Sequence, residues 1–235
     1  MRIESITNVG LYRENNEDRY LVNVLDEERA LLVIADGMGG HAAGEIAAEL
    51  AVSCFEGYRP TGSDICAQLR ARMQKAQQSI VERARIDSSC RGMGTTLTAL
   101  MLSGKTAFWA HVGDTRIYLY QECTLLRMTE DHTMAGRLLK KGEITAEEAR
   151  VHPYAHVLTQ CMGCERYEPD SGVFYPGEGD VVLLSSDGLH DLIPDSRIAA
   201  ILSTEADLAE KLAQMVSACL QAGGRDNITA LIAGL

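Results

Sequence analysis

The chain has 235 residues, of which 46% are hydrophobic and 23% charged, which suits one globular domain with a sizeable core. Its 33 acidic and 22 basic residues give a net charge of −11. This balance excludes nucleic acid or an anionic membrane as the main partner, because both require clustered Lys and Arg. No apolar run approaches the roughly 20 residues of a membrane-spanning helix, and the start lacks a signal peptide, so we expect a cytoplasmic protein.

The predicted elements begin with a β-hairpin over residues 20–35, followed by helices over 42–58 and 64–85. Strands over 95–102, 106–112 and 116–120 are joined by short turns and must therefore be antiparallel. Short helices and irregular chain are expected over 129–170. Strands at 172–175 and 180–185, helices at 195–202 and 206–222, and a last strand at 228–232 complete the chain.

This order of elements predicts an α+β fold. Its centre is an antiparallel β-sandwich, with a pair of helices on each outer face and one domain spanning residues 1–235. A doubly wound parallel sheet would need a helix between nearly every pair of strands, and residues 95–128 offer none.

Acidic residues stand where predicted strands end beside glycine. Asp36 follows the apolar run at 30–35 and opens the sequence DGMGGH, Asp187 follows the run at 181–186, and Asp226 precedes the last strand. A carboxylate in such a place is costly to bury unless a positive group meets it. Three of them predict a site for hard divalent cations.

A charged segment near the N-terminus adds candidate ligands. Arg13 precedes the adjacent carboxylates Glu17 and Asp18, which point to opposite faces if the chain is extended, so one of them is a direct ligand at most. Arg13 suits bidentate binding of a phosphate. A solvated charged loop is the structural alternative for this segment alone.

Seven short motifs in order give the chain a close resemblance to the type-2C, or PPM, family of metal-dependent protein serine/threonine phosphatases, in its compact bacterial form. The resemblance covers essentially the whole chain. The motifs are RENNED (13–18), DGMGGH (36–41), GMGTT (92–96), VGDTR (112–116), TEDH (129–132), SDGL (186–189) and GRDNIT (224–229).

The resemblance implies a role for each matching residue. Asp36 would bridge two Mn²⁺ or Mg²⁺ ions, and the Gly37 carbonyl would bind one of them. Asp187 and Asp226 would bind the first metal, Glu17 would bind the second, and Asp18 would lie behind the ligands. Asp114 would bind a third, weaker ion together with Asp187, and Asp191 is a further candidate ligand there. Arg13 would bind the substrate phosphate.

The chemistry of a phosphate monoester calls for such a centre. Two metals about 4 Å apart supply a bridging hydroxide for in-line attack and neutralise the phosphoryl oxygens. The leaving alkoxide then needs a proton. Some relatives carry His directly after the Asp-Gly pair, whereas this chain has Met38, which cannot donate one. His41 is the nearest residue that could donate this proton. Alternatively, His41 only shapes the turn before the following helix, and a metal-bound water donates the proton.

Two segments have other expected roles. Residues 133–157 match the family's flap, a small helical subdomain beside the active site that selects substrates. Cys161 and Cys164, with His152 and His156 upstream, allow a zinc site as a minor alternative. The odd total of seven cysteines without a signal peptide favours reduced thiols over a disulfide framework.

The predicted function is hydrolysis of phosphoserine and phosphothreonine in proteins, by a monomer that opposes a serine/threonine protein kinase and acts on that kinase and its targets. One alternative is a metal-dependent phosphatase of small phosphate esters. The other is a non-catalytic module that binds phosphoproteins, which the combined presence of Asp36, Asp187, Asp226, Glu17 and Arg13 disfavours.

Overall fold

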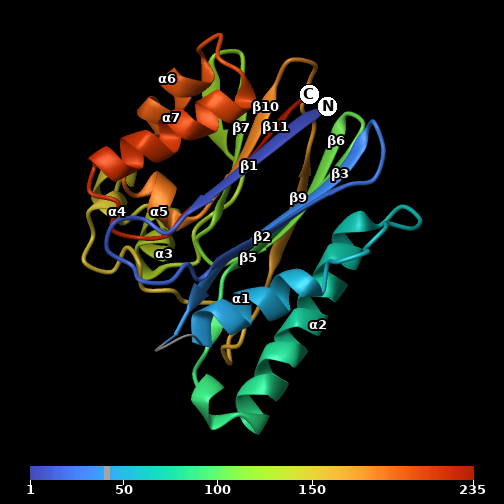
Figure 1. Ribbon diagram of the computed structural model, residues 1–235, viewed down its shortest axis with the longest axis vertical. Coiled ribbons are helices and arrows are strands. Elements are labelled where there is room, and N and C mark those ends of the chain that lie inside the picture. Colours follow the sequence, from blue (N-terminus) through green and yellow to red (C-terminus); the bar gives the residue numbers. More distant parts are fainter. Residues whose placement is uncertain (40–42) are drawn as a thin grey trace.

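The computed structural model describes residues 1–39 and 43–235. Two antiparallel sheets pack face to face, and helices cover the outer face of each (Figure 1). The predicted α+β sandwich is therefore confirmed. We call the two sheets A and B.

Sheet A has the strand order β1-β11-β10-β7-β8 and sheet B the order β2-β3-β5-β6-β9, with β4 pairing β3 at one end. The strands of sheet A are β1 (Arg2–Asn8), β7 (Arg116–Gln121), β8 (Thr124–Arg127), β10 (Val181–Ser185) and β11 (Ile228–Gly234). The strands of sheet B are β2 (Asp18–Val24), β3 (Arg29–Met38), β4 (Gly94–Thr95), β5 (Leu97–Ser103), β6 (Thr106–Val112) and β9 (Asp170–Phe174).

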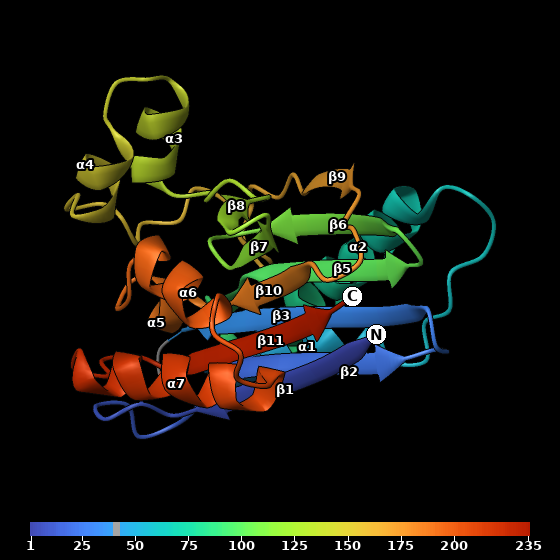
Figure 2. The same cartoon turned by 90° about the horizontal axis from the view of Figure 1, so that it is seen from above.

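The helices fall into two layers and one projecting group. α1 and α2 cover sheet B, α5 to α7 lie over sheet A, and α3 and α4 project from one end of the sandwich (Figure 2). Among the described residues, no helix combines the length and apolar character needed to cross a bilayer. The helices are α1 (Ala43–Ser53), α2 (Ile65–Ile86), α3 (Met134–Lys140), α4 (Ala146–Arg150), α5 (Asp187–His190), α6 (Asp195–Leu202) and α7 (Leu208–Gln221), with a 3₁₀ turn, η1 (Ser88–Cys90).

The apolar run before Asp36 forms the buried strand β3. Its alternate side chains enter different cores: Leu31 and Val33 face the α1–α2 layer, whereas Leu32 and Ile34 face sheet A. Because both faces are covered, the strand is hydrophobic at every position from Ala30 to Ala35 rather than at alternate ones. This burial fixes the register of β3 and, with it, the position of the carboxylate at its end.

Two strands were absent from the sequence prediction, and both lie at edges of sheet A. β1 alternates polar and apolar residues and is mostly exposed, and β8 has only four residues. Neither segment carries enough buried apolar surface to stand out in the sequence. The hairpin predicted from residue 20 begins two residues earlier, at Asp18.

The segment at 133–157 is closed at its base. Thr133 forms an isolated β-bridge with Leu158, and the predicted capping box of Thr145 and Glu148 opens α4. The segment therefore leaves and rejoins the sandwich at adjacent points.

Cys161 and Cys164 follow this segment and are joined as a disulfide, with their Cα atoms 5.5 Å apart. This pairing differs from the expectation of seven reduced thiols. Among the described residues, His156 groups with Asp187 and Asp191 as possible metal donors rather than with the two cysteines, so the zinc alternative gains no support.

A buried ion pair connects β7 to the chain that enters α3. Arg116 donates from Nε to Oδ1 of Asp131 at 2.9 Å and from Nη2 to Oδ2 at 2.6 Å. The two side chains are only 16% and 12% exposed. Arg127 adds a contact to Asp131 at 3.3 Å. Removal of the carboxylate would leave the Arg116 charge buried without its bidentate partner.

We expect Asp131→Ala to lower the free energy of unfolding by about 3–5 kcal/mol, the usual cost of breaking a buried pair on one side. The matched control is Asp26→Ala, which removes an exposed partner of Arg29 and should leave the free energy of unfolding almost unchanged. Urea unfolding of both variants measures the difference. Equal losses would contradict the assignment of Asp131 as a structural anchor.

Candidate metal centre

The acidic residues predicted from strand ends converge at one end of the sandwich. Asp18 and Asp36 are paired neighbours in the register of β2 and β3, so their side chains lie on the same face of sheet B. Asp187 and β10 are separated by one residue, as are Asp226 and β11. Since β10 and β11 are neighbours in sheet A, these two carboxylates also lie together.

The carboxylates of the two sheets act on one another. Burial raises the pKa of Asp187 to about 7, and the charges of Asp191 and Asp226 add to the effect. Burial and the charge of Asp187 likewise hold the pKa of Asp36 well above its usual range. The charge of one central predicted ligand therefore acts on the other, although 151 residues separate them in sequence.

Asp18 is buried behind this pair. Its Oδ2 accepts a hydrogen bond from Ser186 Oγ at 2.8 Å, whereas Oδ1 is buried without a hydrogen-bond partner. Burial raises its pKa to about 6, against the opposing effect of hydrogen bonds from Thr229 and Ser186. An unsatisfied buried oxygen beside the ligand cluster fits a group that holds a bound water rather than the ion itself.

Gly37 permits the close approach of three segments. Its N–H donates to the carbonyl of Glu17 at 3.3 Å. A Cβ on Gly37 would lie 2.3 Å from the Gly44 carbonyl oxygen and 2.7 Å from that of Glu17. Only glycine fits there, so its backbone is held against both the Glu17 loop and the start of α1.

Arg13 and Glu17 line a cavity of about 240 Å³ together with Gly37 and Asp226. Arg13 Nη2 lies 2.7 Å from Oδ2 of Asp226, and its side chain is 55% exposed. That hydrogen bond raises the pKa of Arg13, while burial raises the pKa of Glu17 despite the opposing charge of Arg13. The structure thus gathers one cation and several carboxylates around a space open to solvent.

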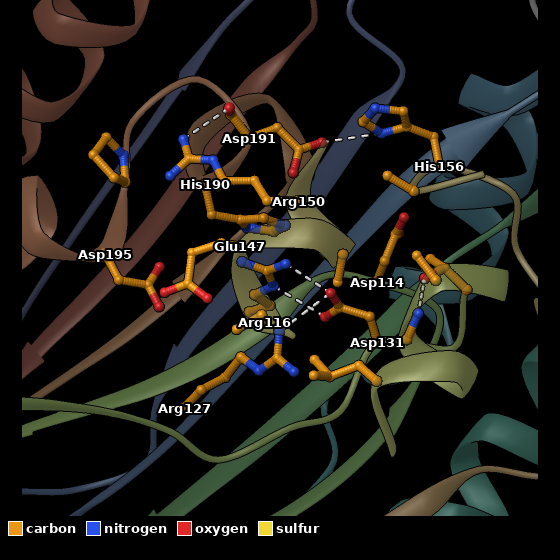
Figure 3. Close-up of a pocket in the computed structure, with 18 of the residues that line it drawn as sticks. Asp114, Arg116, Arg127, Asp131, Glu147, Arg150, His156, His190, Asp191 and Asp195 are labelled. Atoms are coloured by element: carbon orange, nitrogen blue, oxygen red, sulfur yellow. Dashed lines mark hydrogen bonds and ion pairs between the residues drawn. The ribbon is translucent and has the colours of Figure 1, made fainter. Parts of the chain in front are cut away.

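Asp114 and Asp191 lie at a second, larger cavity of about 510 Å³ between the 133–157 segment and the α5–α6 region (Figure 3). Burial and the charge of Asp187 hold the pKa of Asp114 well above its usual range. The predicted third cation position therefore adjoins the main cluster through Asp187.

His156 is a member of this region that the sequence did not predict. Its Nδ1 lies 3.0 Å from Oδ2 of Asp191, and donor atoms of His156, Asp187 and Asp191 lie within 4.8 Å of one another. The hydrogen bond to Asp191 raises the pKa of His156 to about 9, so the imidazole is protonated at neutral pH. No local motif marks His156, because only the folding of the 133–157 segment brings it to Asp191.

Other candidates from the sequence have different outcomes. His41 lies outside the described residues. Met38 ends β3, and its thioether has no proton to donate. His111 and His190 are buried, and burial lowers the pKa of each to about 3. Both are neutral structural residues, as expected for His111 on its apolar strand.

The residues present fit a centre for hard divalent cations. Asp36, Asp187, Asp226 and Glu17 supply carboxylate oxygens, and Gly37 supplies a carbonyl, the ligand types that Mg²⁺ and Mn²⁺ prefer. The pKa values of Asp36, Asp187 and Glu17 are all raised, mainly by burial, because these carboxylates have too little positive charge around them. A divalent cation would remove this deficit.

We expect Mn²⁺ to stabilise the protein more at about pH 8 than at about pH 6. The Asp187 carboxyl has a pKa of 3.8 in the unfolded chain and about 7 in the fold, so the metal-free protein loses stability as the pH rises through this window. Mn²⁺ replaces those protons and relieves the repulsion. Melting temperatures in EDTA and in Mn²⁺ at both pH values measure the effect, and equal Mn²⁺-induced shifts at the two pH values would contradict it.

Comparison with known proteins places this geometry in a family. The family model for protein phosphatase 2C matches residues 13–233. The chain is 37% identical to protein phosphatase PhpP of Streptococcus pneumoniae, covering 100% of this chain and 98% of the relative. It is 36% identical to serine/threonine phosphatase stp of Listeria monocytogenes, covering 99% and 95%.

Solved structures agree with these relatives. The serine/threonine phosphatase PstP/Ppp of Mycobacterium tuberculosis superposes with a TM-score of 0.91 at 35% identity, covering 100% of this chain and 98% of the other. A catalytic domain of PstP in complex with two manganese ions superposes with a TM-score of 0.87 at 33% identity, covering 98% and 96%. From its N-terminal arginine loop to its last strand, the chain belongs to the protein phosphatase 2C family.

Proposed function

We propose that this protein is a metal-dependent phosphatase of phosphoserine and phosphothreonine in proteins. The observation that carries the proposal is an open cavity lined by Arg13, Glu17 and Asp226, with the buried carboxylates Asp36 and Asp187 at the same end of the sandwich. Relatives that match over the full chain are named protein or serine/threonine phosphatases.

The carboxylates would hold two Mn²⁺ or Mg²⁺ ions, with Asp36 between them. Asp187 and Asp226 would complete one site, and Glu17 with the Gly37 carbonyl would serve the centre from the other side. When bound, the two ions supply a water nucleophile activated near neutral pH and neutralise charge that develops on the phosphoryl oxygens. Asp114 with Asp187, and Asp191 as a further ligand, are proposed for a third, weaker cation.

Arg13 would bind and orient the substrate phosphate. Its guanidinium is more than half exposed and is held at the cavity by Asp226, so it can turn toward an incoming anion without losing its place. A planar guanidinium binds two phosphate oxygens at once, which fixes the angle of the phosphoryl group.

His41 is the proposed donor of the proton to the leaving alkoxide. Of the residues that follow Asp36 in this turn, it alone carries a side chain able to donate a proton near neutral pH.

The 133–157 segment is proposed as a flap that selects the protein substrate, within a single domain of residues 1–235. Two of its side chains contact Asp191 beside the metal centre: Arg150 donates to the backbone carbonyl, and His156 contacts the carboxylate. A phosphorylated protein approaching Arg13 would meet this segment. We propose that the substrates include a serine/threonine protein kinase and its targets, and that the enzyme acts as a monomer.

We expect Asp36→Asn to slow Mn²⁺-dependent phosphate release from a phosphothreonine peptide by about 100-fold or more. Loss of the central ligand removes several kcal/mol of transition-state stabilisation, and each 1.36 kcal/mol is a factor of ten in rate. The matched control is Asp26→Asn, which is exposed and remote. Release by the native protein from p-nitrophenyl phosphate alone would favour the small-ester alternative, and no release from either substrate with Mn²⁺ bound would favour a binding module.

We expect His41→Ala to slow hydrolysis of the phosphothreonine peptide by about 10²–10⁴-fold, the usual contribution of a general acid. The loss should be much smaller for p-nitrophenyl phosphate, because its leaving group departs without a proton. The basic limb of the pH–rate profile should also disappear. A basic limb that persists in His41→Ala would remove this residue from the role.

A further inference from the structure

The loop between β1 and β2 carries both Arg13 and Glu17, yet it belongs to neither sheet. This loop contributes residues from the N-terminal part of the chain to the centre, whereas Asp187 and Asp226 come from the C-terminal part. A loop positions functional groups well only where other residues hold its backbone. The question is which residue holds this one.

Asn227, next to Asp226, supplies three hydrogen bonds to this loop. Its Oδ1 accepts from the backbone N–H of Glu17 at 2.8 Å. Its Nδ2 donates to the backbone carbonyls of Val9 and Asn15, each at 3.0 Å. One side chain therefore bonds both ends of the segment that contains Arg13.

The orientation of the Asn227 amide is fixed by its partners. Both donors meet carbonyl oxygens and the acceptor meets an N–H, so the reversed amide would face like groups at all three positions. The residue is only 5% exposed, which leaves water little access as a substitute. Three backbone groups of the loop thus bond to this one amide.

Close backbone packing holds Asn227 itself in place. A Cβ on Gly188, directly after Asp187, would lie 2.0 Å from the Asn227 carbonyl oxygen. A Cβ on Gly10, in the loop, would lie 2.3 Å from the Asp226 carbonyl oxygen. The chain at 226–227 is therefore fixed between the Asp187 turn on one side and the Arg13 loop on the other.

We propose that Asn227 is the positioning residue that holds the loop with Glu17 and Arg13 in place relative to Asp226 and Asp187. It acts through the loop backbone. The inference deepens the proposed function and rests on the assignment of Glu17 as a ligand and Arg13 as the phosphate-binding residue. In this role Asn227 couples the affinity for the second metal to the geometry of phosphate binding.

The test is Asn227→Ala, measured by calorimetric titration of the metal-free protein with Mn²⁺ and of the Mn²⁺-loaded protein with orthophosphate. We expect about 10-fold or greater loss of Mn²⁺ affinity, in the range typical for residues that support metal ligands, and a weaker affinity for orthophosphate. Arg13→Ala serves as the comparison for loss of phosphate binding alone.

The matched control is Asp180→Ala at another loop. Asp180 is also buried, and its Oδ2 accepts from the backbone N–H of Gly177 and from Gln121, each at 2.6 Å. The Asp180→Ala variant should have a lower melting temperature but unchanged affinities for Mn²⁺ and for orthophosphate. If Asn227→Ala lowers only the melting temperature and leaves both affinities within about twofold of the native values, the proposal is wrong.

Asn227→Asp provides a second variant that keeps the size of the side chain, in case the alanine variant does not fold. Its carboxylate still accepts from Glu17 but cannot donate to Val9 or Asn15. The added negative charge beside Asp226 would by itself strengthen Mn²⁺ binding, so weaker binding supports positioning and stronger binding contradicts it. Neither titration depends on turnover, so a native protein that binds Mn²⁺ but releases no phosphate would overturn the proposed function and leave this inference standing.

Discussion

The packing of the two sheets brings several carboxylates together at one end of the sandwich, and their repulsion is the constraint that the rest of the site must meet. Burial and the charges of neighbouring carboxylates raise the pKa values of Asp36 and Asp187. The hydrophobic core forces this arrangement, because β3 and β10 are buried on both faces and cannot shift to separate their ends. The unfavourable electrostatics are concentrated at the point where a divalent cation makes them favourable.

The centre is complete only when both sheets are in place. Sheet B contributes Asp18 and Asp36, and sheet A contributes Asp187 and Asp226, while the loop with Arg13 and Glu17 crosses from one sheet to the other. Glycine at positions 37 and 188 allows backbones to approach where a side chain would not fit. Metal affinity is therefore a property of the closed sandwich, and cation binding should stabilise the whole fold rather than one loop.

The 133–157 segment adds a part of the site that differs in character from the buried cluster. Its contacts to Asp191 come from Arg150 and His156, which are exposed and charged (Figure 3). Such contacts are weaker and more easily exchanged than the buried pair of Arg116 and Asp131. The contacts of this segment can therefore change while the buried cluster keeps its geometry.

The sequence by itself determined the sandwich, the chain order of its main elements and the acidic residues at strand ends, because buried strands and glycine turns leave local patterns. It did not reveal edge strands β1 and β8, whose residues bury little apolar surface. Only the tertiary structure decided that His156 meets Asp191 and that Asn227 holds the Arg13 loop. Both contacts join segments far apart in sequence, and a hydrogen bond between distant segments has no local periodicity from which to predict it.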